Sequence, residues 1–332
     1  MKKAEPVNEK GKSRPKKNGP IFIAGKPIRP GEALRLNFVV ARLPTGTLID
    51  MPVFVNRSKK AGPCLLLIGG MHGDEINGVE IMRRILVNKS FRPERGTVIS
   101  IPILNIFGFI NFSREVTSGK DINRSFPGSK RGSLASQAAY NLMNEVIPII
   151  DYGIDFHTGG LRINNYPQIR TVMSDSTNSA LANAFAPPFI LNARLRDKSL
   201  RKEATKIKKP ILVYEGGESL RLRKNAIDIG IAGTLRVMKH LGMISEAPES
   251  LYTPIQIAKS TWVRARISGM YHSMARNGTF VQKGETLGLI SEPYGGYQYP
   301  LKCPSDGYII AINNNPIVNR GDALIHLGTE EE

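Results

Sequence analysis

Apolar runs and helical spacings alternate through the middle of the chain. Cys64–Ile68 is an unbroken apolar run before two glycines, typical of a buried strand, and Gly78–Val87 has the spacing of an amphipathic helix. Further strand patterns cover Thr97–Leu104, Tyr152–Phe156, Ile169–Ser174 and Ile211–Tyr214, and helical ones cover Ser133–Ile150, Ser179–Ala186 and Ile227–Leu241. This alternation predicts an α/β fold, with a mainly parallel sheet that has helices on both faces.

The pattern differs at the two ends of the chain. Residues 21–55 hold short extended runs broken by Pro and Gly, which indicates hairpins. After about Pro254 the helical spacings stop, and short apolar runs recur between glycine turns, which predicts a small all-β domain. Residues 1–19 are rich in Lys, Pro and Gly and nearly free of apolar residues, so we expect a disordered tail. The predicted organisation is a tail over 1–19, an α/β domain over 20–258 and a β domain over 259–332.

Length and composition exclude several classes of protein. The 332 residues are enough for about two domains, and 41% hydrophobic content excludes a wholly disordered chain. The apolar runs are far shorter than the ~20 residues that a membrane helix needs. Two cysteines, Cys64 and Cys303, make no disulfide framework. Because no apolar segment follows the charges of the tail, we expect no signal peptide and a cytoplasmic protein.

The charge of the chain is strongly positive. Lys and Arg number 46 against 28 Asp and Glu, a net charge of +18. Part of the excess lies in the tail, and part in the run from Arg194 to Lys209, which has eight basic residues against Asp197 and Glu203. Such a field favours anionic partners, which include small acidic substrates, acidic peptides and nucleic acid.

The strongest local signal is Gly69–Glu75, which directly follows the first buried strand. Two residues separate His72 from Glu75 across the strand-to-helix turn, so both side chains can reach one point. An imidazole with a carboxylate suits Zn²⁺, and a catalytic zinc takes three protein ligands and leaves a fourth position for water. Ligands in α/β proteins gather at the carboxyl ends of strands, which favours a metal site here.

A third ligand is expected at another strand end. His157 ends the strand that begins at Tyr152, and Asp155 on the same face can orient an imidazole. A hydrolytic zinc site also needs a base that takes a proton from water and passes it to the leaving nitrogen. Glu215 follows four apolar residues and precedes two glycines, so we expect it to be this base. Glu218 is expected to cap the next helix.

Substrate-binding groups are predicted in the segment between these strands. Asn123 and Arg124 lie side by side, and a planar guanidinium beside an amide can bind a carboxylate by two parallel hydrogen bonds. Arg114, ten residues earlier, is placed to polarise a scissile carbonyl and to stabilise the oxyanion that forms from it.

Taken in order, these motifs resemble the zinc carboxypeptidase superfamily and, more closely, the succinylglutamate desuccinylase/aspartoacylase family. The resemblance covers about residues 20–330 and rests on four stretches. They are Gly-x-His-Gly-Asp-Glu (Gly70–Glu75), Asp-Leu-Asn-Arg-x-Phe-Pro-Gly (Asp121–Gly128, with Ile122 for Leu), Asp-x-His (Asp155–His157) and Glu-x-Gly (Glu215–Gly217). Each stretch alone is common, whereas four in this order are specific.

The resemblance implies a zinc-dependent deacylase. By it, His72, Glu75 and His157 bind one Zn²⁺ per chain, and Glu215 activates the water. Members of the family remove acyl groups from the nitrogen of amino acids by hydrolysis of a linear amide. We therefore expect an amidohydrolase that acts on a small N-acyl amino acid or a related anion.

The same resemblance assigns the substrate-binding residues. Asn123 and Arg124 would bind a substrate carboxylate, and Arg114 would be the arginine that polarises the carbonyl. Arg162 and Arg170, in the stretch after His157, resemble further substrate contacts.

The C-terminal β domain resembles one half of a biotinyl/lipoyl-type barrel-sandwich. A carrier domain of that type needs a lysine at the tip between its halves, where this chain has Ser291–Tyr297 without a lysine. The carrier interpretation therefore fails, and we expect the domain to border the mouth of the active site or to form a contact in a homo-oligomer.

Two other functions use the same observations. The first is a metallocarboxypeptidase that trims acidic peptides with the same residues. The second is a binding protein on an inactive scaffold whose basic segments meet nucleic acid. No aromatic residues interleave Arg194–Lys209, as a single-strand stacking platform requires, so nucleic acid is the weaker prediction.

Overall fold

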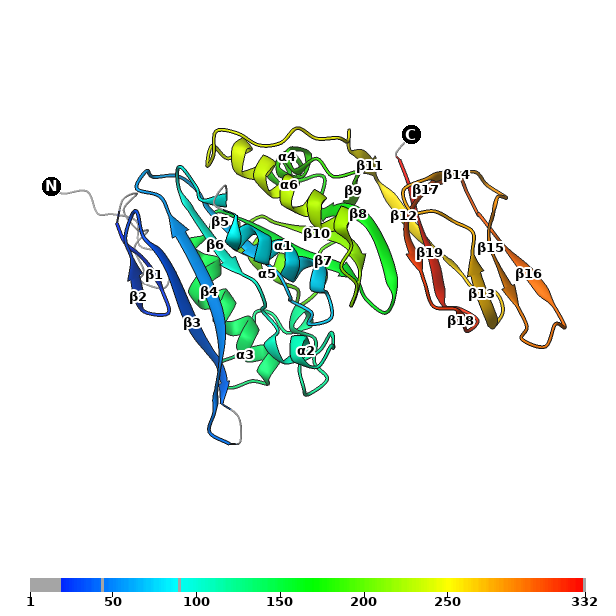
Figure 1. The fold of residues 1–332 in the computed structure, drawn as a ribbon, viewed down its shortest axis with the longest axis horizontal. Coiled ribbons are helices and arrows are strands. Elements are labelled where there is room, and N and C mark those ends of the chain that lie inside the picture. Colours follow the sequence, from blue (N-terminus) through cyan, green and yellow to red (C-terminus); the bar gives the residue numbers. More distant parts are fainter. Residues whose placement is uncertain (1–18, 43–44, 89–90, 331–332) are drawn as a thin grey trace.

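The structure, a computed structural model, describes residues 19–42, 45–88 and 91–330 (Figure 1). Nearly all of the predicted basic tail, residues 1–19, lies outside the described residues. Among the helices of the described part, none is both long enough and apolar enough to cross a bilayer.

One large mixed sheet forms the centre of the molecule. Its main path runs β12-β19-β17-β8-β10-β7-β5-β6-β4-β3, and β9, β11 and β14 pair onto it. Its strands before residue 250 are β3 (Ala33–Arg42), β4 (Leu48–Arg57), β5 (Cys64–Ile68), β6 (Thr97–Ile101), β7 (Tyr152–Gly159), β8 (Ile163–Thr171), β9 (Phe189–Asn192) and β10 (Ile211–Glu218). A separate hairpin, β1 (Ile21–Ile23) with β2 (Lys26–Ile28), packs its isoleucines into the core beneath β3 and β4.

The predicted parallel pairing is found at the centre of this sheet. β6, β5, β7 and β10 are neighbours that run parallel, and each was predicted from its apolar run. The flanking strands are antiparallel, because β4 pairs with β6 and β8 pairs with β10. The sheet as a whole is therefore mixed, since β3–β4 is a hairpin and β8 returns directly from β7 without a crossover helix.

Helices cover both faces of the large sheet, as predicted. Successive side chains of a strand point to opposite faces, so Leu65 and Leu67 of β5 belong to one core cluster and Leu66 and Ile68 to another. The first cluster is covered by α1 (Ile76–Val87), α4 (Ser176–Phe185) and α6 (Lys224–His240), and the second by α3 (Leu134–Asn141) and α5 (Leu200–Lys206).

The helix predicted over Ser133–Ile150 is divided in three. α3 is followed by a π-helical turn, η3 (Leu142–Val146), and by a 3-10 turn, η4 (Ile147–Ile149). Pro148 lies at the start of η4, where a residue without an N–H group cannot continue the α-helical hydrogen bonds.

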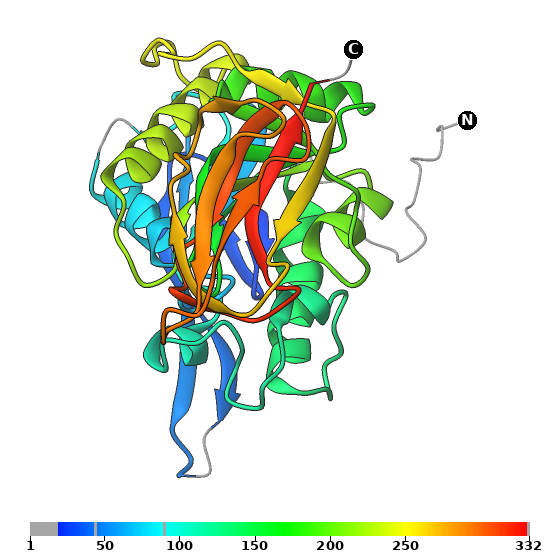
Figure 2. The same ribbon diagram turned by 90° about the vertical axis from the view of Figure 1, so that its right-hand side faces the viewer.

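Residues 255–329, called here the C-terminal β region, form two sheets around a small apolar core (Figure 2). β12, β17 and β19 belong to the large sheet, and β16, β15, β13 and β18 form a second, four-stranded sheet. The bounds are β11 (Ile255–Ile257), β12 (Lys259–Arg264), β13 (Gly269–Ser273), β14 (Phe280–Val281), β15 (Thr286–Ser291), β16 (Gln298–Lys302), β17 (Gly307–Asn313), β18 (Ile317–Val318) and β19 (Ala323–Thr329).

Strand pairing connects this region directly to the α/β half. β17 pairs with the first part of β8, and β11 runs parallel to β9. An apolar cluster fills the junction, with Phe189 and Leu191 from β9 beside Ile257 and Ile310 from the C-terminal β region. The predicted division between residues 258 and 259 therefore lies within a continuous sheet.

Candidate metal centre and active site

The candidate site lies where parallel strands of the large sheet end. His72 and Glu75 come from the loop after β5, His157 lies near the end of β7, and Glu215 lies in β10. His157 and Glu215 are direct neighbours in the pairing of β7 with β10, so their side chains share one face of the sheet.

Close packing against α2 (Ile106–Ile110) fixes the loop between β5 and α1. A Cβ atom on Gly73 would lie 1.8 Å from the backbone carbon of Gly108, so only glycine allows this approach. Glu75 is the N-cap residue of α1, and its side chain makes no capping hydrogen bond. The carboxylate is instead directed toward the two histidines.

The three predicted metal ligands lie together. Nδ1 of His72 is 2.7 Å from Oε1 of Glu75, and Nδ1 of His157 is 2.8 Å from Oε2 of the same carboxylate. The two Nδ1 atoms are 3.2 Å apart, and one donor atom from each residue lies within 4.8 Å of the others. All three side chains are buried. This cluster could hold a metal ion.

The outer nitrogen of each imidazole is held by a carboxylate. Nε2 of His157 is 2.8 Å from Oδ2 of Asp155, the partner expected from the sequence, and Nε2 of His72 is 3.2 Å from Oδ1 of Asp121. A carboxylate on the outer nitrogen fixes the tautomer and the ring orientation of a metal-binding histidine. Both histidines therefore present Nδ1 to the centre of the cluster.

Negative charge dominates the surroundings of the two imidazoles. Burial by itself disfavours the charged histidine, but the carboxylates of Asp155 and Glu75 outweigh it and raise the pKa of His157 well above its usual value. Glu75 and Asp121 together raise the pKa of His72 in spite of its burial. The imidazoles in turn lower the pKa of Glu75 well below its usual value, although burial opposes this. Such a field favours a bound cation.

Arg114 lies beside the cluster. Its Nη1 is 3.2 Å from Oε1 of Glu75, while Nη2 donates to Oδ2 of Asp121 at 2.9 Å. Asp121 thus holds both the imidazole of His72 and the guanidinium of Arg114. This places a positive charge next to the point at which the two histidines converge, and the role of Arg114 in polarising a carbonyl stays a prediction.

Glu215 is held by residues of the adjacent strand β8. Nδ2 of Asn165 donates to Oε2 of Glu215 at 2.7 Å, and Nη1 of Arg170 lies 3.4 Å from Oε1. Gln168 is the direct neighbour of Glu215 in the pairing of β10 with β8. Gln168 is completely buried, and neither atom of its amide has a partner among the described residues.

The other predicted substrate residues differ in how they lie relative to the cluster of His72, Glu75 and His157. Oδ1 of Asn123 accepts a hydrogen bond from the backbone N–H of Leu200 at 3.0 Å, and Arg124 is exposed and donates to the carbonyl of Asn123. Arg162 is exposed at a φ of +62°, and its carbonyl accepts from Asn314 of the C-terminal β region. The structure records no contact between its side chain and the cluster in the described residues.

The prediction for Glu218 is wrong. The N-cap residue of α6 is Arg223, whose side chain makes no capping hydrogen bond and whose backbone N–H donates to Oδ1 of Asn77. Glu218 is instead buried at the end of β10, where it accepts hydrogen bonds from Arg223 and from Nδ2 of Asn314. Strand β10 continues to Glu218 and thereby brings the carboxylate of Glu218 against the C-terminal β region.

The sequence interpretation assigned no role to several residues that the structure places at the site. They are Asp121, Asn165, Gln168 and Arg196. Asp121 is the first residue of the motif that contains Asn123 and Arg124, so its carboxylate was the one feature of the sequence that could have indicated its place at the site. Arg196 belongs to the basic run 194–209; its burial and the cations of Arg124 and Arg170 lower its pKa. Part of that run therefore contributes to a cluster of arginines around Glu215.

Residues 61–241 match the family model described as the succinylglutamate desuccinylase/aspartoacylase catalytic domain. The chain belongs to the succinylglutamate desuccinylase/aspartoacylase family. The family expected from the sequence motifs is thereby confirmed, and the matched segment contains the whole His72, Glu75 and His157 cluster together with Glu215.

Relatives in the succinylglutamate desuccinylase/aspartoacylase family cover most of the chain. An N-alpha-acetyl-L-2,4-diaminobutyric acid deacetylase from Halomonas elongata is 26% identical over 298 residues, which are 83% of this chain and 84% of the relative. A crystal structure of a family member from Rhodobacter sphaeroides is 26% identical, with a TM-score of 0.80 over 91% of this chain and 97% of that one. The product-bound ectoine utilization protein EutE (DoeB) from Ruegeria pomeroyi shares the fold at 22% identity, with a TM-score of 0.81 over 94% of this chain and 99% of that one.

Proposed function

We propose that this protein hydrolyses the amide bond of a small N-acyl amino acid with the help of one Zn²⁺ ion. The observation that carries the proposal is the convergence of His72, Glu75 and His157, with a second carboxylate, Glu215, on the adjacent strand. Membership of the desuccinylase/aspartoacylase family and the deacetylase activity named for the Halomonas relative support the reaction type.

The donor set of the cluster fits zinc. Two imidazole nitrogens and one carboxylate are a usual ligand set of catalytic zinc, and Asp155 and Asp121 already fix the imidazoles with Nδ1 inward. When bound, the ion would act as a Lewis acid on the amide carbonyl and lower the pKa of water.

The chain supplies the base and the stabilisation of charge. Glu215 accepts the proton of the attacking water and gives it to the amide nitrogen as the C–N bond breaks. Asn165 and Arg170 hold its two carboxylate oxygens, which fixes its direction. The guanidinium of Arg114 stabilises the negative charge that develops on the carbonyl oxygen, because it is already fixed by Asp121 and needs little reorganisation.

The substrate is anionic in this proposal. Burial and the nearby charges of Arg124 and Arg170 lower the pKa of Arg196, so several arginines gather beside the single carboxylate of Glu215. We assign Arg124 and Arg170 to the carboxylate of the amino acid, with Asn123 beside them and Arg162 at the rim where the C-terminal β region begins. Bidentate pairing with a guanidinium suits a carboxylate.

Replacement of Glu215 by Gln tests the mechanism. The amide keeps the hydrogen-bonding shape of the side chain but cannot take a proton, so we expect kcat on N-acyl amino acids to fall at least about 100-fold. Zinc content, measured by elemental analysis, should stay at the wild-type level. His157→Ala is the contrasting variant, because it should lose the metal as well as the activity.

Two results would contradict the proposal. One is a Glu215→Gln enzyme with near-wild-type turnover, which would remove Glu215 as the base. The other is wild-type protein that takes up no stoichiometric metal after reconstitution, which would remove the metal-dependent reaction. Blocked acidic dipeptides are assayed in parallel, and hydrolysis of these alone would favour a carboxypeptidase.

A further inference from the structure

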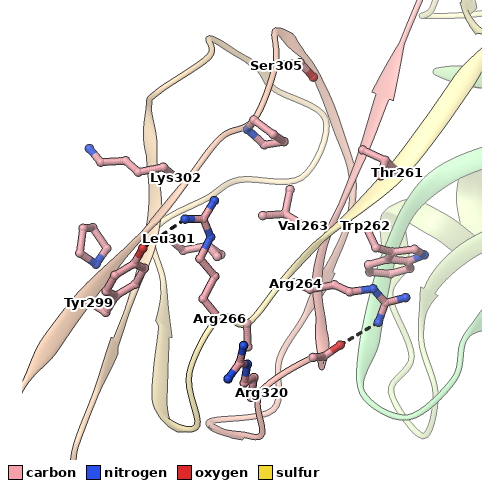
Figure 3. A pocket seen from close by; sticks show the side chains of 14 residues that line it. Thr261, Trp262, Val263, Arg264, Arg266, Tyr299, Leu301, Lys302, Ser305 and Arg320 are labelled. Atoms are coloured by element: carbon pink, nitrogen blue, oxygen red, sulfur yellow. Dashed lines mark hydrogen bonds between the residues drawn. The ribbon is translucent and has the colours of Figure 1, made fainter.

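A groove in the C-terminal β region lies outside the site described above. It has a volume of about 670 Å³ and is lined only by residues between Thr261 and Gly321. Its two walls are β12 and β16, each of which is the edge strand of its sheet, and the turn before β19 closes one end (Figure 3).

Two arginines and no acid face the groove. Arg266 and Arg320 lie at it, whereas Arg264 extends beside Trp262 and Lys302 extends away from it to donate to Thr286 (Figure 3). None of the lining side chains is a carboxylate. Across residues 19–42, 45–88 and 91–330, the ion pairs of the structure involve none of these four side chains. Two uncompensated guanidinium groups that face one hollow repel each other, and a multivalent anion would remove that repulsion.

Neutral partners hold the arginines in place. Nη1 of Arg264 donates to the carbonyl of Gly321 at 2.8 Å, and Nη1 of Arg266 lies 3.4 Å from the hydroxyl of Tyr299. The backbone N–H of Arg320 donates to Ser268. Figure 3 shows Arg266, two residues after the end of β12, extending toward Tyr299 on β16, with Arg320 below it. A guanidinium has five N–H donors, so each arginine keeps donors for a ligand.

We propose that this groove binds a small anion that carries a chain of two or more phosphoryl groups. Both cations that face the groove are arginines, whose forked donors match phosphate oxygens. Linked phosphoryl groups place their negative charges within a few ångströms of one another, so one phosphoryl group can face each arginine. The carboxylates on one face of an extended peptide are about 7 Å apart, which spreads the same charge over a longer segment.

Strand addition by a peptide is also disfavoured at one wall. Pro300 lies in the middle of β16, and a proline on an edge strand cannot donate a backbone hydrogen bond to an added strand. The exposed ring of Tyr299 can in addition contact a planar group attached to the phosphates. The shared ligand chemistry is therefore the phosphate chain, with or without a nucleoside.

Calorimetric titration of the intact protein tests the proposal. The probes are inorganic tripolyphosphate and ATP, each added at low salt and again at high salt. We expect saturable binding of tripolyphosphate that weakens as salt is added. Equal affinity for ATP would assign the site to the phosphate chain alone, whereas tighter binding of ATP would add a contact with the nucleoside. Both results would support the binding of a phosphate chain in the groove.

Matched variants locate the binding. Arg266→Gln combined with Arg320→Gln should weaken tripolyphosphate at least about tenfold, because charged hydrogen bonds are lost from the ligand. Lys26→Gln combined with Arg92→Gln removes the same charge at exposed positions outside the groove and should leave the affinity unchanged. Unchanged affinity in the groove variant, or equal losses in both, would overturn the proposal.

Two further results would also overturn it. One is the lack of saturable binding of either phosphate probe to the wild-type protein. The other is a hexaglutamate peptide that binds as tightly as tripolyphosphate, which would point to acidic peptides. Because amide hydrolysis is not the readout, these results stand apart from the test of Glu215.

Discussion

Gln168 is the residue whose surroundings most clearly call for a partner from outside the chain. Its amide is completely buried, and neither its nitrogen nor its oxygen has a partner among the described residues. Leaving such a group unpaired costs about 1–3 kcal/mol. Gln168 is the direct neighbour of Glu215, and a substrate would reach its amide once the side chains that cover it move aside. We therefore expect Gln168 to bind substrate rather than to stabilise the fold.

Replacement of Gln168 by Leu separates these two roles. Leucine has a similar size and no polar atoms, so the free energy of unfolding should stay equal or rise by about 1 kcal/mol in urea titrations. The KM for the N-acyl amino acid should rise about tenfold or more, which corresponds to one lost hydrogen bond to a charged group. A destabilised variant with an unchanged KM would show that Gln168 has a structural role.

The turn between β5 and α1 joins the fold to the metal site. Gly73 lies between two predicted ligands, and its Cα packs against the backbone of α2. Gly73→Ala should therefore force the turn away from α2, destabilise the protein by about 3 kcal/mol or more and lower the metal content. Gly284→Ala is the control, because its site is open and only its φ of +85° opposes a side chain, at about 1–2 kcal/mol. Equal unfolding midpoints for both variants would contradict this account.

The sequence predicts best those elements whose own residues already show that they are buried. The central strands contain apolar runs because helices cover both their faces, and β5, β7 and β10 were visible for that reason. Strand β8 begins Ile-Asn-Asn-Tyr-Pro-Gln, and only its last part was predicted. Its polar side chains face Glu215 and the site, so their burial depends on strands distant in the sequence. α5 was missed because it buries only Leu200 and Ala204 in a highly charged segment.

Across the whole molecule, the motifs predicted which residues meet, whereas the connection of the two halves was not predicted. Each of the residues His72, His157 and Glu215 follows or ends an apolar strand, and parallel strands bring their ends to one edge. The pairing of Asn165 in β8 with Ala311 in β17 leaves no comparable local signal, because it joins residues far apart in the chain. A boundary drawn from composition alone therefore fell inside one continuous sheet.

This continuity predicts a single unfolding transition for the metal-free protein. The chain has one tryptophan, Trp262 in β12, and all the α-helices of the described residues precede residue 241. Tryptophan fluorescence therefore reports on the C-terminal β region and helical circular dichroism on the other half. Both signals should change at the same urea concentration. Ile310→Ala, at the buried junction, should lower the free energy of unfolding by about 2–4 kcal/mol. The urea midpoints of both signals should therefore fall together. A tryptophan transition at lower urea than the helical one would show that the C-terminal β region unfolds independently.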